Sequence, residues 1–391
     1  MSMTKLDLVN RFVLAKQHLS RDTKNSDVLQ TVRDICALHA TGIATPYLSL
    51  FARIENFRRE ELDEEIYTQK RLGKIRCMRR TIHILPKETI PIAYAATRRG
   101  LQKDSVAFLE FRGVSIDEYE AISKRILEIL KGKEMTTSEI KGILGPEPNI
   151  SAIVEQMCDQ GLLIRGRPTR GWRGKVQNYS RFDEYFPNLD LGRIEEVEAI
   201  PLLVHQYLRS FGPATENDIA WWMGIGKGQA RAALHSIQGQ TEQITISDLD
   251  GTFILLKSDE KRLNNTKTQD MQTVNLLPIL DPYLMGYKIR DRYLSPEHRE
   301  YVFDRGGNAT TTILLDGKVV GVWDFQEDEK PVVKLHFFEK VERSAVSAIR
   351  IEARKIGEFI AEKPIQIKEC DVMVPLTRKN AGGFLAPLKD S

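Results

Sequence analysis

The sequence predicts an α+β protein in which a unit of helices followed by a β-hairpin repeats along the chain, with a small β-rich domain at the C-terminal end. Two observations lead to this fold class: the repeated order of elements, and a change to strand-like alternation after about residue 271. A chain of 391 residues also exceeds what a single hydrophobic core usually supports. We therefore expect four units, at residues 1–112, 113–190, 191–265 and 266–391.

The clearest repeat unit lies within residues 113–190. Apolar residues recur at helical spacing over residues 117–132, and Thr136 with Glu139 has the spacing of a capping box that begins a second helix. A third helix and two strands should follow at residues 151–160, 162–168 and 176–182. A helix-turn-helix followed by a two-stranded wing is the order of a winged helix. The sequence therefore predicts winged-helix domains in tandem.

The same order of elements returns within residues 191–265. Gly212-Pro213 ends a first helix, and Thr215 with Asp218 begins a second. A third helix and a hairpin should follow, at residues 227–237 and 243–257. This second copy strengthens the prediction of a repeat architecture.

The two ends of the chain complete the expected organisation. The N-terminal unit fits a longer third copy, with helices at residues 6–19, 27–40 and 59–70 and a basic hairpin at residues 74–86. The C-terminal unit differs, with antiparallel strands at residues 311–325 and 330–341 and a closing helix at residues 344–362. We expect a small α+β or partial-barrel domain there.

Composition limits the location and chemistry of the protein. The first residues lack the apolar core of a secretory signal, and no uncharged apolar run is long enough for a membrane span, so no membrane partner is expected. The 4 cysteines are dispersed without a Cys-x-x-Cys pair, which predicts reduced thiols, a cytoplasmic, nucleoid-associated protein and no metal site. Phosphate-binding, dinucleotide-binding, nucleophile-elbow and zinc-deaminase motifs are missing from the sequence, so we expect no cofactor.

Positive charge is concentrated in two stretches of a chain whose net charge is only +3. The first is the N-terminal hairpin and the second is the predicted wing between residues 162 and 182, which contains no acid. The DNA-contact candidates are Arg79, Arg80 and His83 in the hairpin, and Arg165, Arg167, Arg170, Trp172, Arg173 and Lys175 in the wing. Arginine and lysine suit phosphates, and Trp172 suits stacking on a sugar or an unstacked base. The alternative is a solvated loop whose tryptophan packs on its own domain.

His39 and Thr41 are the candidate catalytic residues. They lie at the expected end of a helix, in the segment Leu38–Gly42. A helix would splay two residues at this spacing, whereas an extended turn, which Gly42 permits, aims both side chains at one pocket. The alternative for His39 is a structural, hydrogen-bonded histidine.

Several segments of the chain together resemble the AlkZ and YcaQ family of DNA glycosylases. They are residues 38–54 (LHATGIATPYLSLFARI), 80–86 (RTIHILP), 211–215 (FGPAT) with Asp218 and Trp222, 277–283 (LPILDPY) with Arg290, and 316–323 (DGKVVGVW). These matches run in order through most of the chain. The resemblance implies tandem winged helices around a DNA cleft, a C-terminal β domain, and hydrolysis of the N-glycosidic bond of alkylated or crosslinked purines without a metal.

The resemblance places His39 and Thr41 where the family has Gln-x-Gln or Gln-x-Asp. A neutral histidine can orient water or accept its proton, and its reference pKa of ~6.5 suits that task near neutrality. Asp281, in the Leu-Asp-Pro-Tyr segment, is a candidate electrostatic partner, with a capping role as the alternative. We expect a monomeric, monofunctional DNA glycosylase that binds double-stranded DNA. A non-catalytic regulator or lesion sensor and a protein-interaction scaffold are the alternatives.

Overall fold

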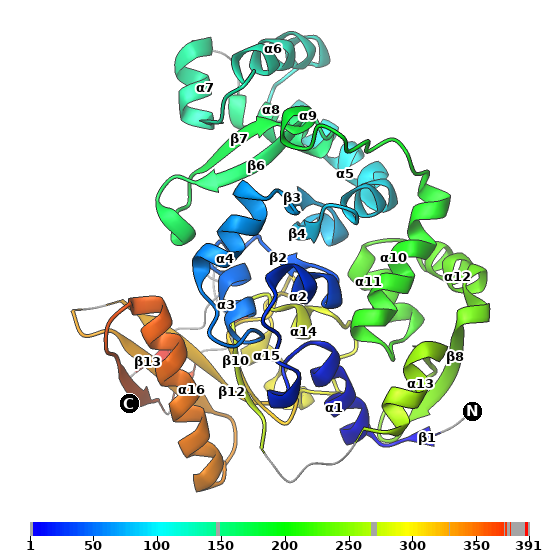
Figure 1. Ribbon diagram of the computed structural model, residues 1–391, viewed down its shortest axis with the longest axis vertical. Helices are drawn as coiled ribbons and strands as arrows, with labels where there is room; N and C mark the ends of the chain where they lie inside the picture. Colours follow the sequence, from blue (N-terminus) through cyan, green and yellow to red (C-terminus); the bar gives the residue numbers. More distant parts are fainter. Residues whose placement is uncertain are drawn as a thin grey trace.

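The computed structural model describes residues 3–145, 149–266, 272–327 and 329–370, with the short pieces 372–373, 376 and 388–389. The N-terminal unit lies at the centre of the molecule (Figure 1). The second unit extends above it, the third lies to the right, and the C-terminal sheet with its long helix lies at the lower left. In the described ranges, no helix is both long enough and apolar enough to cross a bilayer.

The second unit has the predicted order of elements. It consists of β5 (Met135–Thr136), α6 (Ile116–Ile129), α7 (Thr137–Leu144), α8 (Ile150–Asp159), β6 (Leu163–Pro168), a short η4 (Gly171–Arg173), β7 (Gln177–Arg181) and α9 (Phe182–Tyr185). The capping box is confirmed, because Thr136 N donates to the Glu139 carboxylate at 2.7 Å and Glu139 N donates to Thr136 Oγ1 at 3.2 Å. β7 lies between β5 and β6 in a three-stranded antiparallel sheet.

The third unit repeats this order. It consists of α10 (Glu196–Phe211), α11 (Glu216–Met223), α12 (Lys227–Ser236), η5 (Gln238–Gln240), β8 (Thr241–Ile246), β9 (Phe253–Leu256) and α13 (Lys257–Asn264). The predicted capping box of Thr215 and Asp218 is confirmed. β1 (Met3–Thr4) pairs in parallel with β8, so the N-terminal end of the chain adds a strand to this unit.

The N-terminal unit departs from its prediction after Asp34, and it also contains the helix α5 (Ile90–Phe111), which was not predicted. It contains α1 (Leu6–Lys16), η1 (Arg21–Thr23), α2 (Val28–Asp34), β2 (Leu38–His39), α3 (Thr45–Phe51), α4 (Arg59–Asp63), the π-helix η2 (Glu64–Thr68), β3 (Leu72–Arg76), η3 (Met78–Arg80), β4 (Ile82–Pro86) and α5 (Ile90–Phe111). The expected helix at residues 27–40 is wrong beyond Asp34. Cys36 adopts a left-handed φ of 69°, which turns the chain so that Leu38 and His39 pair with β4 instead.

The C-terminal unit is a five-stranded sheet with one long helix. Its elements are β10 (Val274–Leu277), α14 (Pro282–Met285), η6 (Pro296–His298), α15 (Arg299–Val302), β11 (Thr312–Leu315), β12 (Lys318–Gln326), β13 (Val332–Phe337), α16 (Arg343–Ala361), β14 (Gln366–Glu369), and the pair β15 (Val372–Met373) and β16 (Leu388–Lys389). The strand order is β10-β11-β12-β13-β14, antiparallel except for the last pair. α16 buries Ile349 and Ile356 in one cluster with Val333 and Leu335.

Candidate active site

Strand pairing brings His39 together with a second histidine. β2 and β4 are antiparallel, and in their register His39 lies opposite His83. Directly opposed residues project from the same face of a sheet. The two rings accordingly lie with their centroids 4.9 Å apart and are tilted by 54°. This pairing was not predicted, because the segment that contains His39 was read as helix.

Thr41 fixes the environment of His39 from the adjoining turn. Its backbone N–H donates to Nδ1 of His39 at 3.4 Å, and its hydroxyl oxygen accepts the N–H of Ile82 at 3.2 Å. Nε2 of His39 is buried and has no hydrogen-bond partner among the described residues. A buried polar atom without a partner is costly unless a water or a ligand satisfies it. This nitrogen is therefore suited to holding a small polar molecule.

Both histidines are electrically neutral at neutral pH. Burial lowers the pKa of His39 well below its usual value, and His83 and Arg79 lower it further. Burial lowers the pKa of His83 to about 4, with Arg79 adding to this effect and a hydrogen bond to the Thr81 carbonyl opposing it. Only 6% of the His83 side chain is exposed. His83 therefore lies in the protein interior beside His39, an arrangement that does not favour the predicted contact with DNA phosphates.

The turn before β4 presents cations to a neighbouring cavity. Arg79 and Arg80 have positive φ values of 51° and 60°. A cavity of about 650 Å³ lies between this turn and the α11–α12 connection, and its lining includes Arg79, Arg80, Arg99 and Lys103. Cys77 also lines it, and Cys77 Sγ is 3.7 Å from Nδ1 of His83. The histidine pair thus lies just behind the wall of a basic cavity.

Arg79 is held over an aromatic ring of the third unit. Its guanidinium lies 3.8 Å from the ring centroid of Trp221, at the end of α11. Gly224 allows this approach, because a Cβ there would lie 3.1 Å from the backbone nitrogen of Arg79. Burial lowers the pKa of Arg79 to about 10, and the charge of Arg290 adds to the effect. It remains a cation at neutral pH.

The wing candidates separate into paired, buried and free side chains. Arg165 is buried and donates to Glu155 at 2.5 Å, an arrangement that does not favour the predicted contact with DNA. Arg167 pairs with Asp63 at 3.1 Å, and Arg173 pairs with Glu327. Arg170 and Lys175 are exposed, and neither has an ion-pair partner within the described ranges.

Trp172 packs on other units of the protein, whereas the alternative prediction had it packing on its own domain. Its ring lies edge-on to Tyr47, with centroids 5.4 Å apart, and 5.9 Å from that of Phe359 on α16. The Arg59 guanidinium lies 4.4 Å from the Trp172 ring centroid. In this arrangement the faces of the Trp172 ring contact protein side chains, which does not favour the expected stacking on DNA.

Asp281 is occupied by a buried ion pair. Arg53 donates to both carboxylate oxygens, at 2.8 and 2.7 Å, and both side chains have 0% exposure. Ser49 Oγ donates to the same carboxylate at 2.8 Å, and the N–H of Tyr283 donates at 2.9 Å, which caps α14. The alternative capping role is confirmed. This arrangement favours the capping role over the predicted stabilisation of a reacting sugar, because the carboxylate oxygens are already satisfied.

Comparison with known proteins decides the family. Residues 32–359 match the sequence profile of the family described as DNA glycosylase AlkZ-like. The chain belongs to the AlkZ-like DNA glycosylase family. Its similarity extends to an interstrand DNA cross-link repair glycosylase of Streptomyces sahachiroi, which is 25% identical over 373 residues, 90% of this chain and 96% of the relative. The solved structure of Streptomyces sahachiroi DNA glycosylase AlkZ superposes with a TM-score of 0.75, at 21% identity, covering 94% of this chain and 100% of that one.

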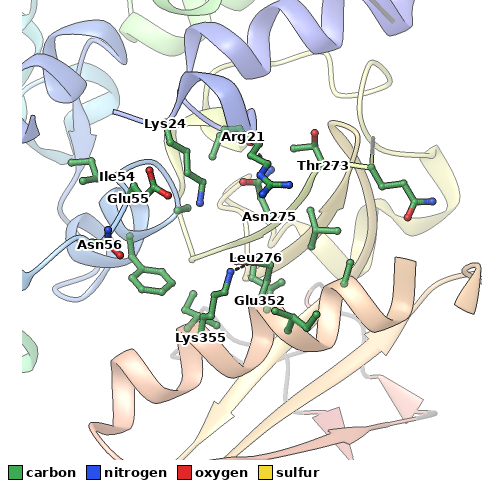
Figure 2. Close-up of a pocket in the computed structure, with 18 of the residues that line it drawn as sticks. Arg21, Lys24, Ile54, Glu55, Asn56, Thr273, Asn275, Leu276, Glu352 and Lys355 are labelled. Carbon is green, nitrogen blue, oxygen red and sulfur yellow. Dashed lines mark hydrogen bonds and ion pairs between the residues drawn. The ribbon is translucent and has the colours of Figure 1, made fainter. Parts of the chain in front are cut away.

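This AlkZ-like protein has a second cavity away from the histidine pair. Figure 2 shows it between β10, α16 and the loops that follow α1 and α3, with a volume of about 830 Å³. Arg21, Lys24 and Lys355 contribute positive charge to its lining, and Glu55, Glu352 and Glu358 contribute negative charge. The lining contains none of the predicted site residues. Since its charges balance, the cavity shows no preference for an anionic or a cationic ligand.

Sequence reasoning missed three features of the site. Arg99 and Lys103 line the basic cavity from α5, and Trp221 supports Arg79 from α11. The basic run through residues 69–104 was the available signal for the first two. No local signal marks Trp221, because its contact with the hairpin depends on how distant units pack.

Proposed function

We propose that this protein is a DNA glycosylase that hydrolyses the N-glycosidic bond of alkylated or crosslinked purines in double-stranded DNA, with no metal ion required. The observation that carries the proposal is the family match, which includes the segment of His39 and Thr41. The unsatisfied Nε2 of His39 supports it, because a water bound there would be oriented by the protein. The resemblance to the family assigns the same segment to catalysis.

Hydrolysis of such a bond requires little acid catalysis from the site. A purine alkylated at N7 or N3 carries positive charge and leaves without being protonated. The enzyme then has to position water and avoid destabilising an oxocarbenium-like sugar. Neutral imidazoles suit this task, because they orient water without adding positive charge beside the sugar.

DNA binding is proposed through the two basic surfaces. The first is the cavity lined by Arg79, Arg80, Arg99 and Lys103. The second is the wing tip, where Arg170 and Lys175 are exposed. Phosphate contacts require cations without exact spacing, so both surfaces fit a backbone-binding role in winged-helix units.

The decisive test uses a duplex that contains one N7-methylguanine. Excision is measured under single-turnover conditions by alkaline cleavage at the abasic site, with and without EDTA. We expect excision that EDTA does not inhibit, and a decrease of about 10² to 10⁴-fold in His39→Ala. His205→Ala, which changes a histidine on α10, is the matched control and should keep the wild-type rate. Binding without excision would contradict the proposal.

A non-catalytic DNA-binding protein is the second candidate. It is favoured by one observation: among the described contacts, no carboxylate bonds to His39 or Thr41, and Asp281 is engaged by Arg53. A regulator should prefer one sequence over random duplex by about 10³-fold or more. Selection from randomised DNA that converges on one motif would establish this alternative over a repair enzyme.

A further inference from the structure

The hydrogen bonds of His39 define which of its nitrogens carries the proton. The backbone N–H of Thr41 can only donate, and it points at Nδ1 of His39. Nδ1 must therefore be the unprotonated acceptor. Because His39 is neutral, its proton is on Nε2, the buried nitrogen without a partner. His39 is thus a hydrogen-bond donor toward the space beside it.

The hydrogen bonds of His83 define the opposite form. Nδ1 of His83 lies 3.1 Å from the carbonyl oxygen of Thr81, which can only accept. Nδ1 must therefore carry the proton of this neutral ring. Nε2 is then a lone-pair acceptor, and the hydrogen bonds of His83 to the described residues Cys77 and Thr81 both use Nδ1. The two facing rings consequently offer one donor and one acceptor.

We propose that His39 and His83 hold the attacking water between them, with His39 donating a hydrogen bond from Nε2 and His83 accepting the water's proton at Nε2. This inference rests on the proposed glycosylase function and adds His83 as a catalytic residue. Two N···O hydrogen bonds through one water span up to about 6 Å. The ring centroids are 4.9 Å apart, so the two rings lie close enough for one water to reach an edge atom of each.

The step balances without a further reactant. The C1′–N bond breaks, and its electron pair leaves with the base and neutralises the cationic purine. The water oxygen forms the new C1′–O bond, and the water's proton passes to Nε2 of His83. His83 then releases this proton to solvent, which its depressed pKa favours. Arg79, Cys77 and His39 are the titratable groups that face it, and none of them is a carboxylate that would stabilise the protonated ring.

The first test reads the proton positions directly. Long-range ¹H–¹⁵N correlation spectra of the full-length protein with labelled histidine distinguish the two neutral forms of imidazole. With 7 histidines in the chain, the His39→Asn and His83→Asn variants assign the two resonances of interest. We expect His39 protonated at Nε2 and His83 protonated at Nδ1. Finding the proton of His83 on Nε2 would overturn the proposal, whether or not any variant is active.

The second test measures single-turnover excision of N7-methylguanine. His83→Asn keeps a donor for the Thr81 carbonyl but cannot take up a proton, so the rate should fall about 10² to 10⁴-fold with unchanged DNA affinity. Added imidazole should restore part of the rate in His83→Ala, whereas His205→Ala should behave as wild type. If the wild-type protein excises and His83→Asn is equally fast, the role of His83 is refuted while the glycosylase function stands. If the wild-type protein does not excise N7-methylguanine, both the role of His83 and the glycosylase function are refuted.

Discussion

Replacing Asp281 by asparagine should destabilise the protein while leaving the chemistry of the folded enzyme intact. Arg53 and Asp281 form a fully buried, doubly hydrogen-bonded pair. Asparagine has nearly the same shape, and its side-chain oxygen can still accept the N–H of Tyr283 that caps α14. The substitution removes the negative charge and replaces the oxygen that accepts from Ser49 and Arg53 with an amide donor.

The expected loss of stability follows from the Arg53 charge that is left unpaired in the core. Removing one partner of a buried pair leaves an uncompensated charge, at a cost of about 3–5 kcal/mol. Domain stabilities are about 5–15 kcal/mol, so this loss is a large fraction of the whole. Replacing both partners by apolar side chains, as in Arg53→Met with Asp281→Leu, should cost less than Asp281→Asn alone, because no charge is left in the core.

Urea unfolding followed by circular dichroism measures the loss, and excision by the folded fraction is measured in parallel. The matched control is the exposed pair Arg33–Glu88, with side-chain exposures of 39% and 55%. Arg33→Ala should change stability by less than about 1 kcal/mol. An Asp281→Asn protein that is as stable as wild type but excises far more slowly would refute the structural role and return Asp281 to the catalytic site.

Three further predictions follow from the same geometry. Replacing Arg170 and Lys175 by alanine should reduce the slope of log affinity against log salt by about 0.9 for each lost phosphate contact, whereas Arg165→Ala should lower stability without changing the slope. The His83 pKa is about 4 in the folded state against 6.5 in the unfolded chain, so the unfolded chain binds more protons between these values and stability should fall as pH drops from 6.5 to 4. The loss of stability between pH 6.5 and 4 is on the order of 3 kcal/mol. His83→Asn should abolish this pH dependence, which unfolding curves recorded across the pH range measure. Thr41→Asp should accelerate excision, because a carboxylate can still accept the N–H of Ile82 and adds negative charge beside the sugar, whereas Thr41→Ala should slow excision less than His39→Ala does; equal rates in all variants would contradict this.

Elements defined by local interactions could be predicted from the sequence. The capping boxes at Thr136 and Thr215 join residues three positions apart, so both helix starts were placed correctly. The alternation of apolar and polar residues over 311–325 likewise predicted β11 and β12, because alternate side chains of a strand lie on its buried face. The helix starts and the strands depend on residues that are close together in the sequence, so the sequence alone was enough to predict them.

The candidate site could be predicted only in part, because its geometry depends on distant contacts. The apolar run through Leu38 is compatible with a helix, and only pairing with β4 makes the segment a strand. Arg165 appears in a basic run, but its buried partner Glu155 lies on α8. Charge density in a sequence therefore locates basic segments without identifying which of their cations point outward.

On the proposed mechanism, the His-x-Thr segment holds the attacking water in the same place as the family's Gln-x-Gln or Gln-x-Asp segment. What differs is the charge that the segment can place beside the sugar. As the C1′–N bond breaks, the positive charge of an alkylpurine passes to the sugar, and a protonated imidazole nearby would repel it. Burial prevents that protonation, because removal from water disfavours the charged form of both His39 and His83. A histidine on the DNA-contacting surface would retain an ordinary pKa and would become charged beside the phosphates. The burial of His83 therefore keeps the ring neutral until the water attacks, and its lowered pKa favours release of the accepted proton afterwards.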